Sequence, residues 1–317
     1  MPYNPTNCKF GFLTDTHFSV VRNSFRTDGF FESVLSKFKQ CYDYFNASGC
    51  EFVLHGGDMF DKYRSYSYPM ILQIRDVIVK SKIPTYFIWG QHDLMGYNRA
   101  SSRNSNLEFL QQICDNKLIE IKDFVELKSV YLFASHVDQD CIDVLRGINP
   151  RIIKPVVSVV HALLFNAESS FGTIDVRKIG KIKPALVLSG DLHSGFEQTE
   201  IENTVYYNPG SLARTSREKR KPKAAVIEMT PFMNEWSINI KEFFPKCEEF
   251  PFPEVETADI TVSDQQDSEE YIEAFEKFKA ESTDIIERLE QVGKHHNIDS
   301  EVLEYIKSKG HKDDSVC

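Results

Sequence analysis

The sequence predicts an α/β fold, a four-layer α-β-β-α sandwich of two packed sheets with helices outside and a short C-terminal helical appendage. Apolar runs of strand length alternate with helical patterns through the first two hundred residues, and from Thr204 the pattern changes to strands alone. The expected strands are Lys9–Leu13, Phe52–Leu54, Pro84–Trp89, Val156–Val160, Ala185–Leu188, Val205–Tyr207, Ala224–Glu228 and Trp236–Phe244.

Helices are predicted between these strands. A helix is expected over Phe30–Phe45, where apolar side chains recur at helical spacing. Residues 69–79 repeat the pattern and carry a proline near the start, where a helix tolerates it. Shorter helices are expected over Asn106–Cys114 and Val137–Leu145.

The chain is expected to contain a main domain, residues 1–247, and an appendage, because 317 residues exceed one typical domain. The prolines of Phe250-Pro251-Phe252-Pro253 make a stiff break within an acidic linker, residues 248–266. Residues 267–317 are expected to form a helix-loop-helix. Its first helix carries an apolar stripe of Tyr271, Phe275, Phe278, Ile285, Leu289 and Val292. The stripe either packs on the protein's own body or binds a partner.

The charge is divided unevenly along the chain. The net charge is −10, from 37 Lys and Arg and 47 Asp and Glu. Residues 248–317 hold 7 of the basic and 20 of the acidic residues, so residues 1–247 hold 30 and 27. A body with a balance of +3 is compatible with binding a phosphate backbone, and the acidic excess belongs to the tail.

Five short segments place metal-binding side chains just after expected strands. They are Asp15-Thr16-His17, Gly57-Asp58, Gly90-Gln91-His92-Asp93, His161 and Gly190-Asp191-Leu192-His193. Side chains just past the carboxyl ends of strands in an open α/β sheet converge on one crevice. The set has too many oxygen and imidazole ligands for one ion and suits two. The ligand chemistry favours manganese, with magnesium, zinc or iron as alternatives.

Each of these segments is weak evidence by itself. A single Asp-x-His is seldom a site, Gly-Gly-Asp after a strand is often a turn, and a lone histidine such as His161 more often packs in a core. Their joint occurrence, in order and at strand ends, favours a shared binuclear site. The remaining histidines fit no such pattern and are expected to be structural or exposed: His55, His136, His295, His296 and His311.

In this order the motifs resemble those of the calcineurin-like metallophosphoesterases. Within that superfamily, Gly57-Asp58-Met59-Phe60-Asp61 and Tyr207-Asn208-Pro209-Gly210-Ser211-Leu212 resemble the SbcD-type DNA double-strand-break repair nucleases. Bacteriophage recombination nuclease subunits of that type are the nearest likeness. The resemblance covers residues 8–245 and implies a two-metal phosphodiesterase in the sandwich fold described above.

The resemblance also implies a role for each matched residue. One metal ion would be held by Asp15, His17, Asp58 and His193, and the second by Asp58, Gln91, His161 and Asp191. His92 matches a histidine that contacts the scissile phosphate and assists the leaving oxygen, and Asp93 would orient His92.

Three positions depart from the family pattern. Gln91 replaces the usual Asn, Asp191 stands where His is common, and Asp61 stands where many relatives have a phosphate-contacting His. The first two changes fall on the second metal. We therefore expect a second site that is weaker or tuned to hard, oxygen-loving ions.

The segment from Arg214 to Lys223 contains six basic residues and one Glu. It is either a solvated hairpin or a patch that follows the phosphates of DNA. The basic residues are Arg214, Arg217, Lys219, Arg220, Lys221 and Lys223. The two tail helices resemble the element by which SbcD-type nucleases bind the coiled-coil base of an SbcC-type ATPase.

The resemblance thus implies a DNA nuclease subunit, with 3′-to-5′ exonuclease activity on duplex DNA and endonuclease activity on single strands, promoted by ATP through its partner. A homodimer is expected from the family. Two alternatives use the same fold. One is a stand-alone phosphatase or cyclic-nucleotide phosphodiesterase, and the other is a non-catalytic scaffold, which the departures at Gln91 and Asp191 keep open.

The sequence favours a cytoplasmic protein, in the bacterial host cytoplasm if the origin is a phage. It has no run of about 18 apolar residues that could span a membrane and no signal peptide pattern at its start. Its seven cysteines form no Cys-x-x-Cys pair and are odd in number, so we expect reduced thiols.

Overall fold

A computed structural model of the protein describes residues 7–21, 28–64, 67–148, 154–167, 173–215, 221–233 and 235–247. The chain divides into two compact units, Met1–Pro253 and Glu254–Cys317. Every described residue belongs to the first unit. The predicted helix-loop-helix of residues 267–317, and the linker before it, lie outside the described residues.

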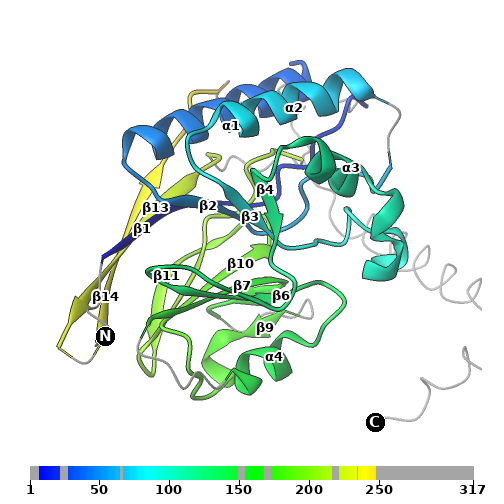
Figure 1. Cartoon of the computed structure of the whole chain (residues 1–317). Helices are drawn as coiled ribbons and strands as arrows, with labels where there is room; N and C mark the ends of the chain where they lie inside the picture. The colour runs from blue at the N-terminus through cyan, green and yellow to red at the C-terminus, as the bar shows by residue number, and fades with distance from the viewer. Residues whose placement is uncertain are drawn as a thin grey trace, which may run out of the picture. The chain divides into compact units, whose positions relative to one another are not determined.

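Two six-stranded sheets form the centre of the described part (Figure 1). The first has the order β14-β13-β1-β2-β3-β4 and the second β11-β12-β10-β7-β6-β5. In each sheet the inner strands pair in parallel, and antiparallel strands extend it. The strands are β1 Cys8–Leu13, β2 Phe52–His55, β3 Thr85–Phe87, β4 Leu118–Glu120, β5 Phe124–Glu126, β6 Tyr131–Ser135, β7 Val156–Ala162, β10 Leu186–Asp191, β11 Phe196–Ile201, β12 Thr204–Asn208, β13 Ala224–Phe232 and β14 Glu235–Phe243, with the short pair β8 Leu164–Phe165 and β9 Ile174–Asp175.

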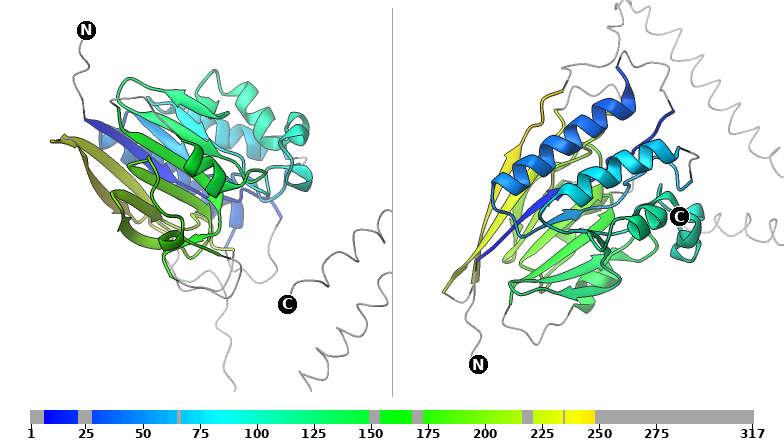
Figure 2. Two further views of the ribbon diagram at one scale, coloured as in Figure 1. Left: turned by 90° about the horizontal axis from the view of Figure 1, so that it is seen from below. Right: turned by 45° about the horizontal axis from the view of Figure 1, so that its top comes forward.

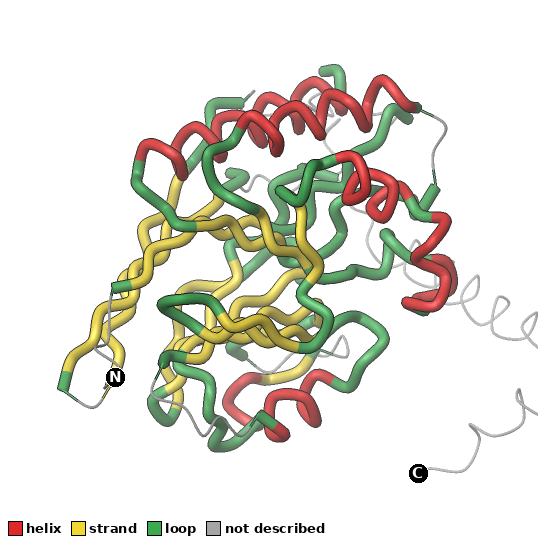
Figure 3. The backbone as a smooth tube through the Cα atoms, viewed as in Figure 1, coloured by secondary structure: helices red, strands yellow, loops and turns green. Residues whose placement is uncertain are grey.

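Helices cover the outer faces of both sheets, as Figure 3 shows, and this confirms the predicted four layers. Helices α1 (Phe30–Ala47), α2 (Tyr68–Lys80) and α3 (Asn106–Ile113) lie over the first sheet, with α1 and α2 side by side (Figure 2). Helix α4 (Cys141–Gly147) lies under the second sheet and starts four residues later than predicted. Short 3₁₀ turns are η1 (Met95–Tyr97), η2 (Arg99–Asn104) and η3 (Val176–Lys178).

Three apolar cores separate the four layers. The first packs α1, α2 and α3 on one sheet, the second lies between the two sheets, and the third packs α4 on the other sheet. In the second core, the rings of Phe10 and Phe52 from neighbouring strands stack at 5.0 Å. Because apolar burial fixes both sheets face to face, the loops at one end of their strands have a rigid base.

The described cysteines agree with the expectation of reduced thiols. Cys8, Cys41, Cys50, Cys114 and Cys141 are free and buried, and Cys247 is free and exposed. Among the described helices, none has the length and apolarity needed to cross a lipid bilayer.

Candidate metal centre

Two loops that leave neighbouring parallel strands hold the first ligands. After β1 and β2 end, the N–H of Asp15 donates to the carbonyl of Gly57 (3.1 Å), and the N–H of His17 donates to the carbonyl of Asp58 (3.0 Å). Asp15, His17 and Asp58 have φ angles of 52°, 43° and 50°. Left-handed backbone is unfavourable for residues other than glycine. The pairing of the two loops therefore holds three ligand residues in conformations that they would not adopt alone.

The loop after β3 approaches Asp58 so closely that it requires glycine at position 90. A Cβ atom on Gly90 would lie 2.1 Å from Oδ1 of Asp58. The N–H of His92 donates to the same Oδ1 atom at 2.8 Å. One oxygen of Asp58 is thus occupied by the backbone, and Oδ2 is left for other partners.

The Oδ2 atom of Asp58 is the focus of the site. It is fully buried, and no described group donates a hydrogen bond to it. The Nε2 atoms of His161, His17 and His92 lie 3.5, 3.8 and 4.0 Å away. A buried carboxylate oxygen without a donor is costly. Imidazole nitrogens converging on such an oxygen therefore fit divalent cations that Asp58 would bridge.

Asp15, His17 and His193 form one ligand group beside Asp58. Their ligand atoms all lie within 4.8 Å of one another. The two imidazole Nε2 atoms are 2.9 Å apart, and they lie 3.9 and 3.7 Å from Oδ1 of Asp15. The other ring nitrogen of His193 contacts the hydroxyl of Thr215 at 3.1 Å, which orients the ring. The structure thus brings together the residues of the first predicted metal.

Asp15, Asp58 and His161 form a second group, and Gln91 and Asp191 lie next to it. Nε2 of His161 lies 2.6 Å from Oε1 of Gln91. The amide of Gln91 donates to Oδ1 of Asp191 at 2.6 Å. His161 lies inside β7 and Asp191 ends β10, so these two ligands belong to the strands themselves and do not follow them as expected. All seven predicted ligands lie in this one cluster.

The protonation of the ligands follows from their partners. Both ring nitrogens of His161 face carbonyl oxygens, of Gly56 (2.7 Å) and of Gln91 (2.6 Å), so both carry hydrogen and the ring is cationic. Burial alone would lower the pKa of His161, but the negative charge of Asp58 raises it to about 10. Burial lowers the pKa of His17 to about 3, so this ring is neutral at pH 7. Burial raises the pKa of Asp15 to about 6.

The structure corrects the role expected of Asp93. Its carboxylate accepts hydrogen bonds from the backbone N–H groups of Met59, Phe60 and Gly90. The partner of the His92 ring is instead the carbonyl of Asp61, 2.9 Å from Nδ1 of His92. Asp93 is fully buried between two loops, so it fixes these loops and does not orient the ring.

Asp61 lies within the cluster as well. A carboxylate oxygen of Asp61 and ring nitrogens of His17 and His92 lie within 4.8 Å of one another. The position where the resemblance led us to expect a histidine is thus filled by an acidic side chain close to two imidazoles.

Thr16 and His55 tie the first two ligand loops together, and no sequence pattern signals this pairing. The Thr16 hydroxyl donates to the carbonyl of Met59 (2.9 Å) and lies 3.1 Å from Nε2 of His55. Since the hydroxyl has one hydrogen, His55 must be the donor in the second contact. His55 and His136 are buried and hydrogen-bonded, as expected for structural histidines.

The turn after β12 links the loops of Asp15 and His193. The N–H of Ser211 donates to the carbonyl of His193 (3.1 Å), and its hydroxyl lies 2.8 Å from the carbonyl oxygen of Asp15 and 2.6 Å from that of Ala213. The amide of Asn208 donates to the carbonyl of Leu192 at 3.2 Å. The sequence motif at 207–212 therefore has a positional role that only the folded chain reveals.

The predicted DNA-binding segment is described only in part. Arg217, Lys219 and Arg220 lie outside the described residues. Lys221 is exposed, whereas Arg214 and Lys223 are buried. Lys223 forms ion pairs with Glu197 and Glu242, so its charge is neutralised inside the protein, and Lys223 is better interpreted as structural. The partner-binding stripe, Tyr271 to Val292, lies outside the described residues.

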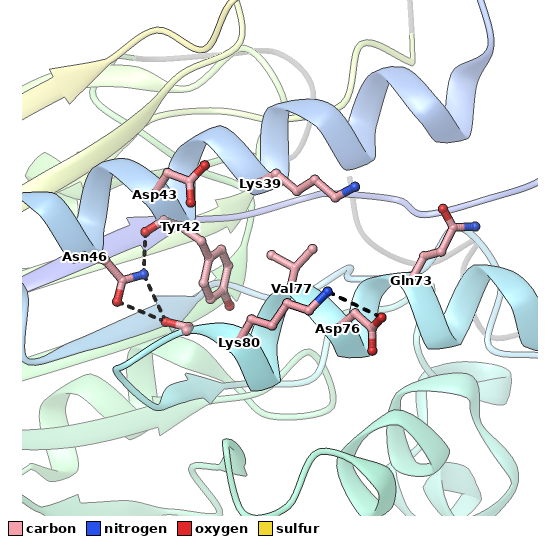
Figure 4. A pocket seen from close by; sticks show the side chains of 9 residues that line it. Lys39, Tyr42, Asp43, Asn46, Gln73, Asp76, Val77 and Lys80 are labelled. Carbon is pink, nitrogen blue, oxygen red and sulfur yellow. Dashed lines mark hydrogen bonds and ion pairs between the residues drawn. The ribbon is translucent and has the colours of Figure 1, made fainter.

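A separate hollow of about 280 Å³ lies between α1 and α2 (Figure 4). Its charged groups are Lys39, Asp43, Asp76 and Lys80, and the last two pair at 3.8 Å. It contains none of the cluster residues. We therefore assign the chemistry to the loop cluster.

The fold and the cluster define a metal-dependent phosphoesterase. The model of the calcineurin-like phosphoesterase family matches residues 8–195, more than half of the chain, and the protein belongs to this family. The family consists of hydrolases that use divalent metal ions, and the described part of this chain contains clusters of Asp and His side chains that could hold such ions. The scaffold alternative therefore has no support from the site.

Solved structures similar to this chain include an archaeal phosphodiesterase, with 15% identity and a TM-score of 0.39. They also include the protein TT1561 of Thermus thermophilus (10%, 0.47) and a dimetal phosphatase from Danio rerio (10%, 0.49). The matches cover 74%, 74% and 75% of this chain and 99% of each of those chains. With TM-scores below 0.5, these likenesses carry no argument about substrate. No curated protein matches the sequence.

Proposed function

We propose that this phosphoesterase is a DNA nuclease subunit that cleaves phosphodiester bonds at the cluster around Asp58. The supporting observation is the exposure of the site. The side chains of His92 and His193 are 43% and 33% exposed, whereas Asp15, His17 and Asp58 are fully buried behind them. A site open at the protein surface can receive a phosphate within a polymer. The body's charge of +3 also permits approach of DNA.

The donor set fits two divalent cations of the manganese or magnesium type. Asp15, His17, Asp58 and His193 would hold one, and Asp58, Gln91, His161 and Asp191 the other. Bound divalent cations would supply an activated water and neutralise charge on the phosphoryl oxygens. The amide oxygen of Gln91 and the carboxylate of Asp191 favour hard ions at the second metal position.

His92 is the proposed acid of the reaction. Its Nδ1 faces the carbonyl of Asp61 and therefore carries a hydrogen, so Nε2 is the atom that exchanges a proton with substrate. The water oxygen forms a bond to phosphorus while its proton passes to solvent, the ester P–O bond breaks, and the departing sugar oxygen takes the Nε2 proton, which the His92 ring regains from solvent. The backbone N–H of His92 donates to Oδ1 of Asp58, and this hydrogen bond fixes the position of the His92 ring relative to the site.

The test is cleavage of labelled duplex and single-stranded DNA in Mn²⁺ by wild type and His92→Ala. We expect wild type to cut DNA and His92→Ala to be slower by about 10²–10⁴-fold, with Mn²⁺ affinity retained. Bis-p-nitrophenyl phosphate is assayed in parallel. Hydrolysis of this small diester as fast as DNA would favour the stand-alone phosphodiesterase instead.

We also propose that the nuclease acts as a homodimer with a coiled-coil ATPase, bound through the apolar stripe of residues 271–292. Support comes from the sequence pattern alone, in which the stripe follows an acidic linker. Deleting residues 265–317 should leave a folded, metal-binding body that no longer binds the ATPase. Retained binding by the truncated chain would exclude this role for the stripe.

A further inference from the structure

A hollow of about 470 Å³ begins one residue beyond the ligand His193. Ser194 and Gly195 contribute to its wall. The loop is fixed there, because the N–H of Gly195 donates to the carbonyl of Leu192 (2.9 Å) and a Cβ on Gly195 would lie 2.6 Å from the carbonyl oxygen of Asn208. Consecutive Cα atoms are about 3.8 Å apart. The wall of the hollow is therefore built in part on the same fixed loop that carries His193.

Three phenylalanines contribute to the wall of this hollow. Phe196 is buried, and its ring meets that of Phe165 edge to face at 6.4 Å. Phe244, just after β14, is 51% exposed. Exposed and half-exposed aromatic rings around a concave surface offer faces for a planar partner to stack on.

The charged groups of the hollow do not suit a phosphate. Lys223 is paired with Glu197 at 3.4 Å and with Glu242, which also accepts a hydrogen bond from the hydroxyl of Tyr207 (3.0 Å). The two acids neutralise this lysine. Lys221 is exposed at the hollow and has no ion pair with any other described residue. The interior thus suits a neutral ring, and a phosphate can reach only the exposed Lys221.

We propose that this hollow binds an unpaired nucleobase of the strand whose phosphate is cleaved beside His193. The inference rests on the proposed nuclease function and adds a base-binding subsite to it. The volume falls in the range of about 300–1,000 Å³ found for ligand pockets. A base within a duplex presents only its edge, so stacking on Phe165 or Phe244 requires that the base has left its pair.

The test uses labelled single strands in which one abasic residue is moved position by position along the sequence. Wild type should cut more slowly at the one bond whose neighbouring nucleotide lacks its base, by about 5- to 100-fold. The double variant Phe165→Leu, Phe244→Leu keeps apolar bulk but removes the aromatic faces. It should cut intact DNA more slowly and lose the dependence on the abasic position. Phe244→Tyr in a chain that keeps Phe165 should retain this dependence.

Phe124→Leu is the matched control, because Phe124 is 59% exposed on the edge strand β5 and belongs to neither site. It should behave like wild type. Equal Mn²⁺ affinity and equal melting temperature in all variants establish that the fold is intact. A flat abasic profile in a wild type that cuts DNA would overturn the subsite alone. A wild type that binds Mn²⁺ but cuts no DNA would overturn the nuclease proposal together with it.

Discussion

Three backbone N–H groups from two loops converge on Asp93. Met59 and Gly90 donate to Oδ2 at 3.2 Å, and Phe60 donates to Oδ1 at 2.9 Å. Leaving one buried donor unsatisfied costs about 1–3 kcal/mol. Asp93→Ala should therefore lower the free energy of unfolding by about 3 kcal/mol or more and weaken Mn²⁺ binding. Denaturant unfolding and calorimetric titration measure the two effects.

Asp76→Ala is the control for this variant. The Asp76 carboxylate is 51% exposed and pairs with Arg75 and Lys80, and exposed pairs contribute only about 0–1 kcal/mol. We expect a small change in stability and none in Mn²⁺ affinity. A similar loss of stability in both variants would contradict the role assigned to Asp93.

Metal uptake should release protons, because His161 is cationic without metal. Its pKa is raised to about 10, so the ring is protonated at pH 7 and a cation must displace the Nε2 hydrogen. Affinity at the second site should consequently rise with pH, by up to about tenfold per unit between pH 7 and 9. Below pH 6, protonation of Asp15 should weaken binding further.

Calorimetric titration of Mn²⁺ in two buffers with different ionisation enthalpies counts the released protons. We expect about one proton at pH 7 from His161, and none from His17, whose pKa is about 3. His161→Asn should abolish the release. Mn²⁺ binding by wild type without proton release would show that His161 is neutral or is not a ligand.

At the scale of elements, the loop after β3 depends on the absence of a side chain at Gly90. A Cβ there would lie 2.1 Å from Oδ1 of Asp58 and 2.3 Å from the backbone nitrogen of Asp58. The backbone of Asp58 could make room for it only by displacing the ligand loop. Gly90→Ala should weaken Mn²⁺ binding by at least about 10-fold. Gly147→Ala is the control, because a Cβ at the end of α4 meets nothing within 4 Å. Equal Mn²⁺ affinities for both variants would show that this close approach is unimportant.

The elements that could be predicted from the sequence are those with a clear period. Helices α1 and α2 have apolar stripes, and β1, β2 and β7 are mostly apolar runs, so their positions followed from the residues. Strands β4 and β5 have only three residues each, too few for a period to appear. They were not predicted, and neither were β6 and β11, although these have five and six residues.

The candidate site also divides into residues that could be predicted from the sequence and residues that could not. The ligands could be predicted because each lies within a few residues of the carboxyl end of a strand. The residues that hold the ligand loops in place could not be predicted. Thr16 meets His55 across 39 positions, and Ser211 meets Asp15 across 196. Single hydrogen bonds between distant loops leave no pattern in one sequence. The hydrogen bonds of Asp93 and the structural role of Lys223 could therefore be found only from the folded structure.

At the scale of the whole molecule, the charge balance changes near the boundary between the two compact units of the chain. The first unit ends at Pro253. Residues 254–317 carry 18 acidic and 7 basic residues, a balance of −11 against −10 for the whole chain, so residues 1–253 have a net charge of +1. A polyanion approaching the full chain meets a net repulsion that the body alone would not produce.

Truncation after Pro253 should therefore strengthen DNA binding at low salt. Exposed charges are screened over about 8 Å at physiological ionic strength, so the gain should shrink as salt is raised and vanish near 1 M, where the screening length is about 3 Å. Fluorescence anisotropy with a labelled duplex across a salt series measures this, with melting temperature as the check on folding. If the truncated chain binds DNA more weakly than the full chain at every salt concentration, the acidic segment contributes to DNA binding and does not oppose it.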